Sequence, residues 1–453
     1  MGYVSTPNDK DINKLSQKVK KDILLHPNFK IGKNGLESSF NSRLTGKSGY
    51  KKTEVNAFNV PLKELDRKGA EKGKDIRLTL DLNLQKYIYK RVENLRAGIV
   101  VLNVKTGEIL SMVSTPSFDA NQFVDGISSD YWNSLINDVK KPMFNKTISA
   151  LYAMGSTFKP IVAISALENG WDKKKEVDCK GIMNITRKQL FKCWTWKDHG
   201  HGKLSIVEAL ERSCNIFFAN IGLYAGVSNI YNTAKKLGIG EDFSINLLEY
   251  NAGVLPNHAW KLKNYGESWT KGDTINMSIG QGYILANPLQ MAVAVSRIAN
   301  GGYPIKPFLI YNSPVKDYNK NLYNLEAMFN KDNIDIVKQG MYNVINAKKG
   351  TARWTKPKDK KYQISGKTGT AQIVGKYGGY ISSDYDNIRS FAGLFPYENP
   401  EFIIYISVKK LAAPSTAIAD SVKSIVESIA KYKNLSDLQV EEDKSKIIKI
   451  KKE

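Results

Sequence analysis

Hydrophobic and polar residues follow periodic patterns along most of the chain beyond its first 75 residues. Alternation at Ile76, Leu78 and Leu80 predicts a short strand, and a spacing of three to four residues over 84–95 predicts a helix directly after it. Two apolar runs within 96–114 flank the turn residues Lys-Thr-Gly-Glu, which predicts a β-hairpin. This region therefore begins with a strand, a helix and a hairpin.

The middle of the chain predicts buried helices. The apolar run 155–170 ends at an Asn-Gly pair, and the run 205–226 is read as a second helix that a glycine closes. By contrast, 123–141 is rich in polar residues and is typical of a loop excursion.

The last third of the chain predicts sheet strands followed by one helix. The segments 364–372, 390–396 and 401–410 read as antiparallel strands, and 418–432 reads as an amphipathic closing helix. One face of that helix carries Ile418, Val422, Ile425 and Ile429. The fold class is therefore α+β: an antiparallel sheet with helices packed against it.

Composition limits the possible classes of protein. At 453 residues, 42% of them hydrophobic, the chain is long enough for two domains plus tails. Its net charge of +23 fits either an anionic partner or solvated surface lysines. No nucleic-acid-binding motif accompanies this charge, so we expect no nucleic-acid partner. No apolar run reaches the roughly 18 residues that span a bilayer, and the first residues do not form a signal peptide.

The start of the predicted helix at 155–170 carries candidate chemistry. Ser156 and Lys159 are three residues apart and share one helix face, so the amine can reach the hydroxyl. Apolar neighbours would desolvate Lys159 and favour its neutral form, which can accept the serine proton. A Ser-x-x-Lys match alone is weak in a chain so rich in lysine.

Two further motifs make the match specific. Ser213 and Asn215 form a Ser-x-Asn motif, and Lys367 begins a Lys-Thr-Gly motif on a predicted strand. Ser-x-x-Lys, Ser-x-Asn and Lys-Thr-Gly in this order are the signature of penicillin-binding proteins and class A β-lactamases. We expect Gly369 to let a substrate strand approach the sheet edge closely.

With these motifs in place, the chain resembles the class B penicillin-binding proteins, the peptidoglycan D,D-transpeptidases. Among them it is most similar to the elongation-specific penicillin-binding protein 2 group. The resemblance covers nearly the whole chain. It includes the segments GLESSFNSRLTGKSGYKKTEVN, DIRLTLDLNLQ, VLNVKTGEILSMVSTPSFDAN, NKTISALYAMGSTFKP, INMSIGQGYILANPLQMA, KKGTAR and GKTGTAQ.

The resemblance implies a role for each motif residue. Ser156 would be the nucleophile that attacks the penultimate D-Ala carbonyl of a stem peptide, and Lys159 the general base. Ser213 and Lys367 would complete the proton relay to the leaving D-alanine. Asn215 would hydrogen-bond the backbone of the donor peptide.

The resemblance also implies how substrate is held. Thr368, Gly369 and Thr370 would form the substrate-binding strand, with the two threonine hydroxyls on the terminal carboxylate or its β-lactam counterpart. The backbone N–H groups of Ser156 and Thr370 would form the oxyanion hole. A second stem-peptide amine would then resolve the acyl-enzyme into a cross-link, whereas β-lactams stop at the acyl stage.

The family implies a domain plan and a location. Residues 1–80 would be part of a non-catalytic pedestal domain, 81–432 a transpeptidase domain with helices on both sides of its sheet, and 433–453 a polar tail. In the family, the motif Gly-Tyr-Val-Ser lies well inside the chain, after a membrane anchor, so this sequence would be a fragment or would have lost its anchor. Family members act on the periplasmic side of the bacterial inner membrane, with elongation-complex membrane proteins that include a glycosyltransferase.

All three cysteines of the chain lie within 36 residues. Cys179, Cys193, His201 and Cys214 give the pattern Cys-x13-Cys-x7-His-x12-Cys, a Cys₃His set suited to tetrahedral zinc. The resemblance supports this set, because some penicillin-binding protein 2 members hold a metal ion with one ligand inside the second motif. A closed, structural zinc site would staple the preceding loop to the helix that carries Ser213.

Other interpretations remain open at this point. His199 competes with His201 as a ligand, Asp178 could replace Cys179, and a disulfide between Cys179 and Cys193 would leave Cys214 as a core residue. A D,D-carboxypeptidase or β-lactamase would use water in place of the acceptor amine. A non-catalytic scaffold or a β-lactam-sensing domain would keep the fold and lack the turnover.

Overall fold

The structure is a computed structural model of the chain. It describes the ranges 2–15, 21–186, 189–243, 245–359, 363–371, 387–409 and 423–429. By its internal contacts the chain divides into two units, with residues 1–78, 117–143 and 244–250 in the first and 79–116, 144–243 and 251–453 in the second. The segments 117–143 and 244–250, which the sequence places in the transpeptidase domain, thus have their contacts in the first unit.

The first unit is built from short elements. They are β1 (Val4–Ser5), α1 (Asp9–Leu15), α2 (Lys21–Leu24), β2 (Ile31–Gly32), α3 (Gly35–Ser39), α4 (Asn41–Leu44), β3 (Tyr50–Val55), β4 (Pro61–Lys68), η1 (Ala120–Phe123) and α6 (Ser129–Asn137). β1 pairs antiparallel with β2. The ring of Tyr3 stacks on Phe123 at 4.1 Å, and Phe118 packs edge-on against both rings. The excursion expected over 123–141 therefore contains a helix, α6, with Ser128 as its N-cap.

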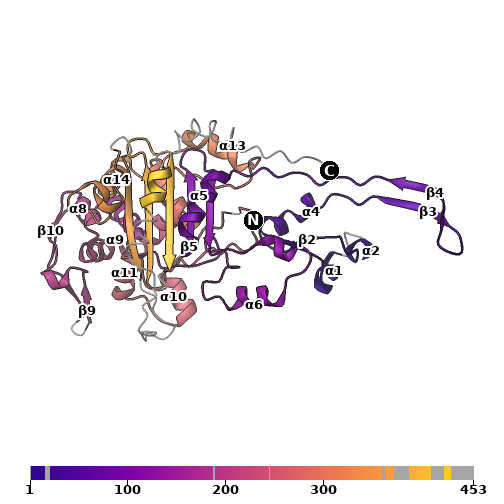
Figure 1. Cartoon of the computed structure of the whole chain (residues 1–453). Helices are drawn as coiled ribbons and strands as arrows, with labels where there is room; N and C mark the ends of the chain where they lie inside the picture. Colours follow the sequence, from indigo (N-terminus) through magenta and orange to yellow (C-terminus); the bar gives the residue numbers. More distant parts are fainter. Residues whose placement is uncertain are drawn as a thin grey trace. The chain divides into compact units, whose positions relative to one another are not determined.

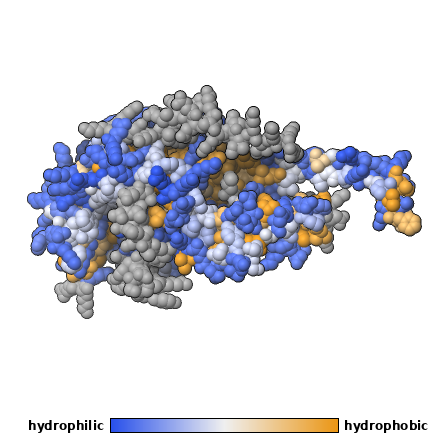
Figure 2. Space-filling model, in the orientation of Figure 1, coloured by the Kyte–Doolittle hydropathy of each residue, from blue (hydrophilic) through white to orange (hydrophobic). Residues whose placement is uncertain are grey.

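The hairpin of β3 and β4 is a two-stranded ribbon without a hydrophobic core (Figure 1). Every residue of β4 is exposed, and Phe58 in the turn is 87% exposed. Figure 2 shows hydrophobic residues gathered at the tip of this ribbon. An isolated two-stranded ribbon is only marginally stable in water, so this hairpin contributes little to the stability of the unit.

The second unit contains a five-stranded antiparallel sheet with the order β11-β12-β13-β5-β6. Its strands are β5 (Arg96–Asn103), β6 (Ile109–Thr115), β11 (Ser365–Ala371), β12 (Ile388–Phe395) and β13 (Phe402–Lys409). The predicted hairpin and the three late strands are thus confirmed. β11, which carries the Lys-Thr-Gly motif, is an edge strand of this sheet.

Helices cover both faces of the sheet, as the fold class predicted (Figure 1). On one face, α5 (Leu82–Val92), the end of α14 (Lys331–Asn346) and the helical residues 423–429 share a core with Ile99 and Val101 of β5. On the other face, α12 (Pro288–Ala299) packs on β5, β12 and β13. β5 is buried along nearly its whole length because both of its faces are covered.

The remaining helices of the second unit and the small strands beside them are η2 (Gly155–Phe158), α7 (Lys159–Glu168), β7 (Val177–Cys179), β8 (Ile182–Thr186), β9 (Gln189–Lys192), η3 (Trp196–Asp198), β10 (Gly202–Leu204), α8 (Ile206–Glu211), α9 (Asn215–Lys236), α10 (His258–Tyr265), α11 (Lys271–Ser278), α13 (Val315–Lys320), η4 (Leu322–Asn324) and η5 (Arg353–Thr355). Among these helices, α7, α8 and α11 pack against α9. Within the described ranges, no helix combines the length and the apolar character that a membrane span needs.

Three sequence predictions need correction or limitation. Residues 76–80 do not form a strand; instead, Thr79 donates from Oγ1 to the carbonyl of Ile109, and from both its N–H and Oγ1 to the carbonyl of Leu309. The helix expected over 205–226 is two helices, because the backbone breaks between α8 and α9. The break expected at Gly226 is confirmed: its φ of 76° and ψ of 157° are non-helical, and a further helical stretch follows it within α9. Of the closing helix, 423–429 is described; Ile418, Val422 and the tail 433–453 lie outside the described residues.

Candidate active site

A cavity of about 230 Å³ brings the three motifs together. It lies within the second unit. Its walls include Ser156, Trp194, Ser213, Asn215, Ile279, Gln281, Thr351, Thr368, Gly369 and Thr370. The first motif, the second motif and the edge strand therefore face one space, although the segment from Ser156 to Thr370 spans more than 200 positions of the sequence.

Ser156 is held on a tight turn at the start of α7. The preceding Gly155 has a left-handed φ of 55°, and a side chain there would lie 2.6 Å from the carbonyl oxygen of Thr370. The Gly155 N–H donates to the carbonyl of Gly280 at 2.9 Å. Only glycine fits between these two backbones, so the turn that presents the serine is fixed from both sides.

Lys159 is fully buried, and its amine points at the second motif. Its Nζ donates to the carbonyl oxygen of Ser213 and to Oδ1 of Asn215, each at 2.7 Å, and lies 3.3 Å from Oγ of Ser213. Burial lowers the pKa of Lys159 to about 8, although the nearby Cys214 and Cys193 act in the opposite direction. A minor fraction of the amine is therefore neutral near physiological pH, and this fraction grows as the pH rises toward 8, which is the direction that the sequence interpretation required.

The expected hydrogen bond between Lys159 and Ser156 is not formed. Among the described residues, the amine bonds only to Ser213 and Asn215. In ligand-free enzymes, catalytic hydrogen bonds are often long and tighten only when substrate binds. The two side chains remain on adjoining turns of one segment, within the reach that the Ser-x-x-Lys spacing provides.

Ser213 links the two buried lysines. Lys367, also fully buried, donates from Nζ to Oγ of Ser213 at 2.9 Å. Burial and the neighbouring Lys159 hold the pKa of Lys367 well below its usual range. A continuous chain of polar groups therefore runs from one amine through a hydroxyl to the other.

The backbone at Ser213 is strained. Its φ is +54°, a left-handed value that a non-glycine residue rarely adopts. Cys214 follows as the N-cap of α9, and its Sγ accepts the N–H of Phe217 at 3.4 Å. This break aims Ser213 and Asn215 at Lys159 and explains why the expected single helix is divided here.

The edge strand β11 presents the third motif. Thr368 and Thr370 line the cavity, and within the described ranges no strand pairs with the free edge of β11 beside them. Gly369 also lines the cavity, and a side chain there would meet the carbonyl oxygen of Met154 at 2.8 Å and Cγ2 of Thr157 at 2.9 Å. The glycine therefore makes room for the nucleophile turn, and its expected role beside a substrate strand stays a prediction.

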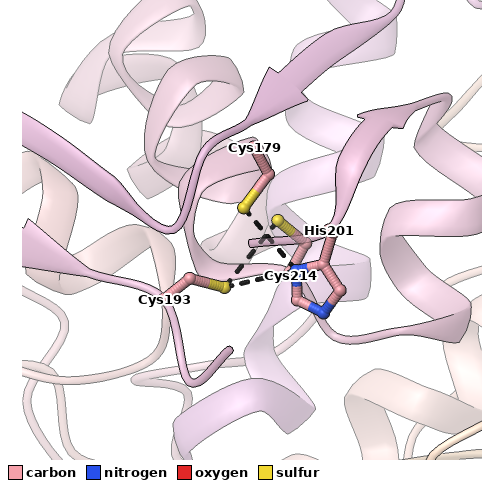
Figure 3. A group of neighbouring side chains, drawn as sticks. All are labelled: Cys179, Cys193, His201 and Cys214. Atoms are coloured by element: carbon pink, nitrogen blue, oxygen red, sulfur yellow. Dashed lines mark hydrogen bonds between the residues drawn. The ribbon is translucent and has the colours of Figure 1, made fainter. Parts of the chain in front are cut away.

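The four predicted metal ligands converge in a buried cluster (Figure 3). The ligand atoms of the four residues all lie within 4.8 Å of one another; the residues are Cys179, Cys193, His201 and Cys214. Sγ of Cys193 lies 4.0 Å from Sγ of Cys214 and 3.4 Å from Nδ1 of His201, and Sγ of Cys179 lies 3.6 Å from the same nitrogen. Such a Cys₃His cluster can hold a metal ion.

Backbone pairing brings the ligands together. β7 pairs antiparallel with β10, so that Cys179 lies opposite Gly202, and the N–H of His201 donates to the carbonyl of Cys179 at 2.9 Å. The N–H of Cys193 donates to the carbonyl of Gly181 at 2.8 Å. Cys214 enters from the start of α9.

The structure decides between the alternative ligands. His199 and Asp178 are exposed and lie outside the cluster, so His201 and Cys179 are the cluster members. All three cysteines are free, which excludes the disulfide between Cys179 and Cys193 in this structure.

The cluster adjoins the cavity directly. The N–H of Asn215 donates to Sγ of Cys193 at 3.4 Å. Trp194, which lines the cavity, packs edge-on against the ring of His201 and donates from Nε1 to the carbonyl of Arg212 at 3.2 Å. The cluster therefore orients both a motif residue and a cavity wall.

Comparisons with known proteins give the family. Residues 97–431 match the penicillin binding protein transpeptidase domain, and residues 1–78 match the penicillin-binding protein dimerisation domain. The peptidoglycan D,D-transpeptidase MrdA of Haemophilus influenzae is 33% identical over 447 residues, which cover 94% of this chain and 67% of the relative. The Escherichia coli K12 protein of the same name is 32% identical, with 97% and 71% covered. The chain is a class B penicillin-binding protein of the penicillin-binding protein 2 group.

Solved structures of this penicillin-binding protein group match the fold. The Helicobacter pylori protein in a complex between penicillin-binding protein 2 and MreC superposes with a TM-score of 0.79 at 30% identity, covering 96% of this chain and 76% of that one. Pseudomonas aeruginosa penicillin-binding protein 2 in complex with WCK 5153 gives a TM-score of 0.76 at 27% identity, covering 94% and 88%.

Four residues of the cavity of this penicillin-binding protein were not predicted as site residues. They are Trp194, Ile279, Gln281 and Thr351. Trp194 directly follows the candidate metal ligand Cys193, and that adjacency was the available signal. Ile279, Gln281 and Thr351 lie in the segments SIGQG and KKGTAR that carry the resemblance, but nothing in their residue types distinguishes them.

Proposed function

We propose that this chain is a serine-type D-Ala-D-Ala transpeptidase that cross-links peptidoglycan stem peptides and is acylated by β-lactams. The relatives named peptidoglycan D,D-transpeptidase support the reaction class. The observation that carries the proposal is the buried chain of Lys159, Ser213 and Lys367 at the wall of the Ser156 cavity. Two lysines buried beside each other have depressed pKa values, which suits proton transfer at neutral pH.

Acylation uses Ser156 and Lys159. Neutral Lys159 takes the proton of Ser156 as Oγ attacks the penultimate D-Ala carbonyl, and the carbonyl π pair moves onto oxygen. The N–H groups of Ser156 and Thr370 stabilise that oxyanion. When the tetrahedral intermediate collapses, the bond to the terminal D-alanine breaks, and its nitrogen receives through Ser213 the proton that Lys159 took, while Lys367 donates a hydrogen bond to the Ser213 hydroxyl.

Deacylation completes the cross-link. The amine of a second stem peptide attacks the acyl-enzyme carbonyl and gives up a proton to neutral Lys159. The ester bond to Ser156 then breaks, and Oγ regains that proton from Lys159. Asn215 bonds the donor peptide backbone, and Thr368 and Thr370 hold the terminal carboxylate. A β-lactam ring opens in the first step, but its leaving nitrogen stays tethered, so the acyl-enzyme persists.

The experiment that tests this function is acylation by a labelled penicillin followed by turnover of a D-Ala-D-Ala stem peptide with an amine acceptor. We expect one covalent adduct on the native chain, none on Ser156→Ala, and a cross-linked dimer as product. Hydrolysis without cross-linking would favour a D,D-carboxypeptidase. A folded chain that forms an adduct but turns over no peptide would favour a β-lactam sensor, and one that forms none would favour a scaffold.

The Cys₃His cluster supports a structural zinc ion. At Zn–S distances of about 2.3 Å and Zn–N distances of about 2.0 Å, a tetrahedral site has S–S edges of roughly 3.8 Å and S–N edges of roughly 3.5 Å. The Sγ–Sγ separation of 4.0 Å and the Sγ–Nδ1 separations of 3.4 and 3.6 Å lie close to these values. Cys179, Cys193, His201 and Cys214 would hold the ion and supply all four ligands. It would cross-link the loop to α9 and would leave the chemistry to Ser156 and Lys159.

The biological setting follows from the relatives. A Helicobacter pylori relative is solved with MreC, which supports a role of this chain in cell elongation and rod shape, together with membrane proteins that include a glycosyltransferase. The site of action would be the periplasmic side of the inner membrane. Within the chain, 1–80 would serve as part of a pedestal and 81–432 as the transpeptidase domain.

A further inference from the structure

One wall of the cavity carries a hydroxyl that the proposed mechanism does not use. Thr351 lines the cavity, and its Oγ1 lies 3.0 Å from Oγ1 of Thr368 on the edge strand. Among the described residues, neither of these two hydroxyls has another hydrogen-bond partner. Thr351 is therefore paired with a proposed carboxylate-binding group and lies at the same cavity surface.

The backbone holds the Thr351 hydroxyl in this position. Its own N–H donates to the carbonyl of Glu211 at 3.3 Å, and the N–H of the fully buried Ala352 donates to the carbonyl of Val344 at 2.9 Å. A side chain at Gly350 would lie 2.3 Å from that same carbonyl oxygen. The segment is thus clamped on both sides of Thr351, and the hydroxyl is presented by a fixed backbone.

The hydrogen-bond inventory sets the direction of this pair. A hydroxyl has one O–H to donate and two lone pairs to accept, whereas a carboxylate only accepts. When Thr368 donates to a ligand carboxylate, its single hydrogen is used. The hydrogen between the two oxygens must then come from Thr351, which gives the order Thr351 to Thr368 to carboxylate.

We propose that Thr351 is a positioning residue for carboxylate recognition, which acts by fixing the rotation of the Thr368 hydroxyl and polarising it toward the anion. Hydrogen bonds in such a chain strengthen one another, and those to charged acceptors are the strongest. This inference rests on the proposed function of the cavity and adds a specificity residue from outside the three motifs. It predicts an effect only on ligands that carry the anion.

The test compares acylation by benzylpenicillin with acylation by its methyl ester, which keeps the reactive ring and lacks the carboxylate. In Thr351→Val, we expect the acylation rate constant for benzylpenicillin to fall about ten-fold, the scale of one hydrogen bond to a charged group. The rate for the ester should stay within about two-fold of the native value. Thr351→Ser, which retains the hydroxyl, should behave like the native chain with both probes.

A double-mutant cycle identifies the route through Thr368. If Thr351 acts through Thr368, adding Thr351→Val to Thr368→Val should cause no further loss with benzylpenicillin. Equal losses with both probes, no loss with either, or full additivity in the cycle would each overturn the inference while the native chain is still acylated. Absence of acylation in the native chain would overturn the proposed function itself. Thermal unfolding of each variant identifies any that fails to fold.

Discussion

At the scale of single residues, the site depends on two lysines buried without an acidic partner. Among the described residues, no carboxylate lies within hydrogen-bond reach of Lys159 or Lys367. Burial disfavours the charged form of each amine and lowers its pKa. The sequence predicted this for Lys159 from its apolar neighbours, but the pairing of both amines on Ser213 needed the structure.

The first prediction concerns pH. Burial lowers the pKa of Lys159 to about 8, and the base must be neutral to take the serine proton. The acylation rate constant with a labelled penicillin should therefore rise about ten-fold per pH unit between pH 6 and 7, and level off above about 8. The measurement is a stopped-flow profile with circular dichroism at each pH. A flat profile on a folded protein would exclude Lys159 as the titrating base.

The second prediction concerns Gly369. In Gly369→Ala the new methyl would meet Met154 and Thr157 at 2.8 and 2.9 Å, and the nucleophile turn must move away. Because misplacement on the order of 1 Å can lower a rate about 100-fold, we expect acylation to fall about 10- to 100-fold. Overpacking should also reduce the free energy of unfolding by about 1–3 kcal/mol.

Gly272→Ala is the matched control for that substitution. A methyl there has its nearest neighbour, Oγ1 of Thr270, at an ordinary distance of 3.6 Å. Its acylation rate should equal that of the native chain. If Gly369→Ala also acylates at the native rate, the close packing of β11 on the nucleophile turn is not what the catalytic geometry requires.

At the scale of elements, the least predictable feature was the break between α8 and α9. The apolar spacing over 205–226 is helical throughout, so periodicity alone joins the two helices. The break depends on the left-handed backbone of Ser213, and serine has no special preference for that conformation. The cysteine spacing, by contrast, predicted which loops meet, because four soft ligands must converge if they bind one ion.

The third prediction concerns that cluster. Removing the proposed zinc with a chelator should release the loop from α9. Replacing Cys193 by Ser should do the same and should also remove the sulfur that accepts the Asn215 N–H. We expect a lower melting temperature together with an acylation rate at least about ten-fold lower. Native mass spectrometry gives the number of bound ions, and scanning calorimetry gives the stability.

His199→Asn is the control for the cluster, because His199 is exposed, has a left-handed φ of 60°, and asparagine tolerates that conformation. This variant should keep the metal, the melting temperature and the acylation rate. Native acylation by a chain verified to be metal-free would restrict the cluster to a role in local stability.

At the scale of the whole molecule, local pattern predicted the strands but not their order. β5 lies between β6 and β13, so the centre of the sheet joins segments about 300 positions apart. Periodicity is local and contains no information on such pairings. The family resemblance added only that helices lie on both sides of the sheet, and the strand order came from the structure. The division into units shows the same limit, because 117–143 has its contacts with the first 78 residues.

The last prediction follows from this discontinuous first unit. A chain that begins at Thr79 would leave Phe118 and Phe123 without Tyr3, which stacks on Phe123 at 4.1 Å. We expect this shortened chain to aggregate, because aromatic surface becomes exposed. Its monomeric fraction should be acylated at a rate within about three-fold of the full chain, since every residue that lines the cavity lies in the second unit.

The control is the shortened chain with Phe118→Ser and Phe123→Ser, which should restore solubility. Light scattering and penicillin labelling of the monomer distinguish the two effects: loss of labelling in a soluble, folded monomer would show that the first unit is needed to form the active site.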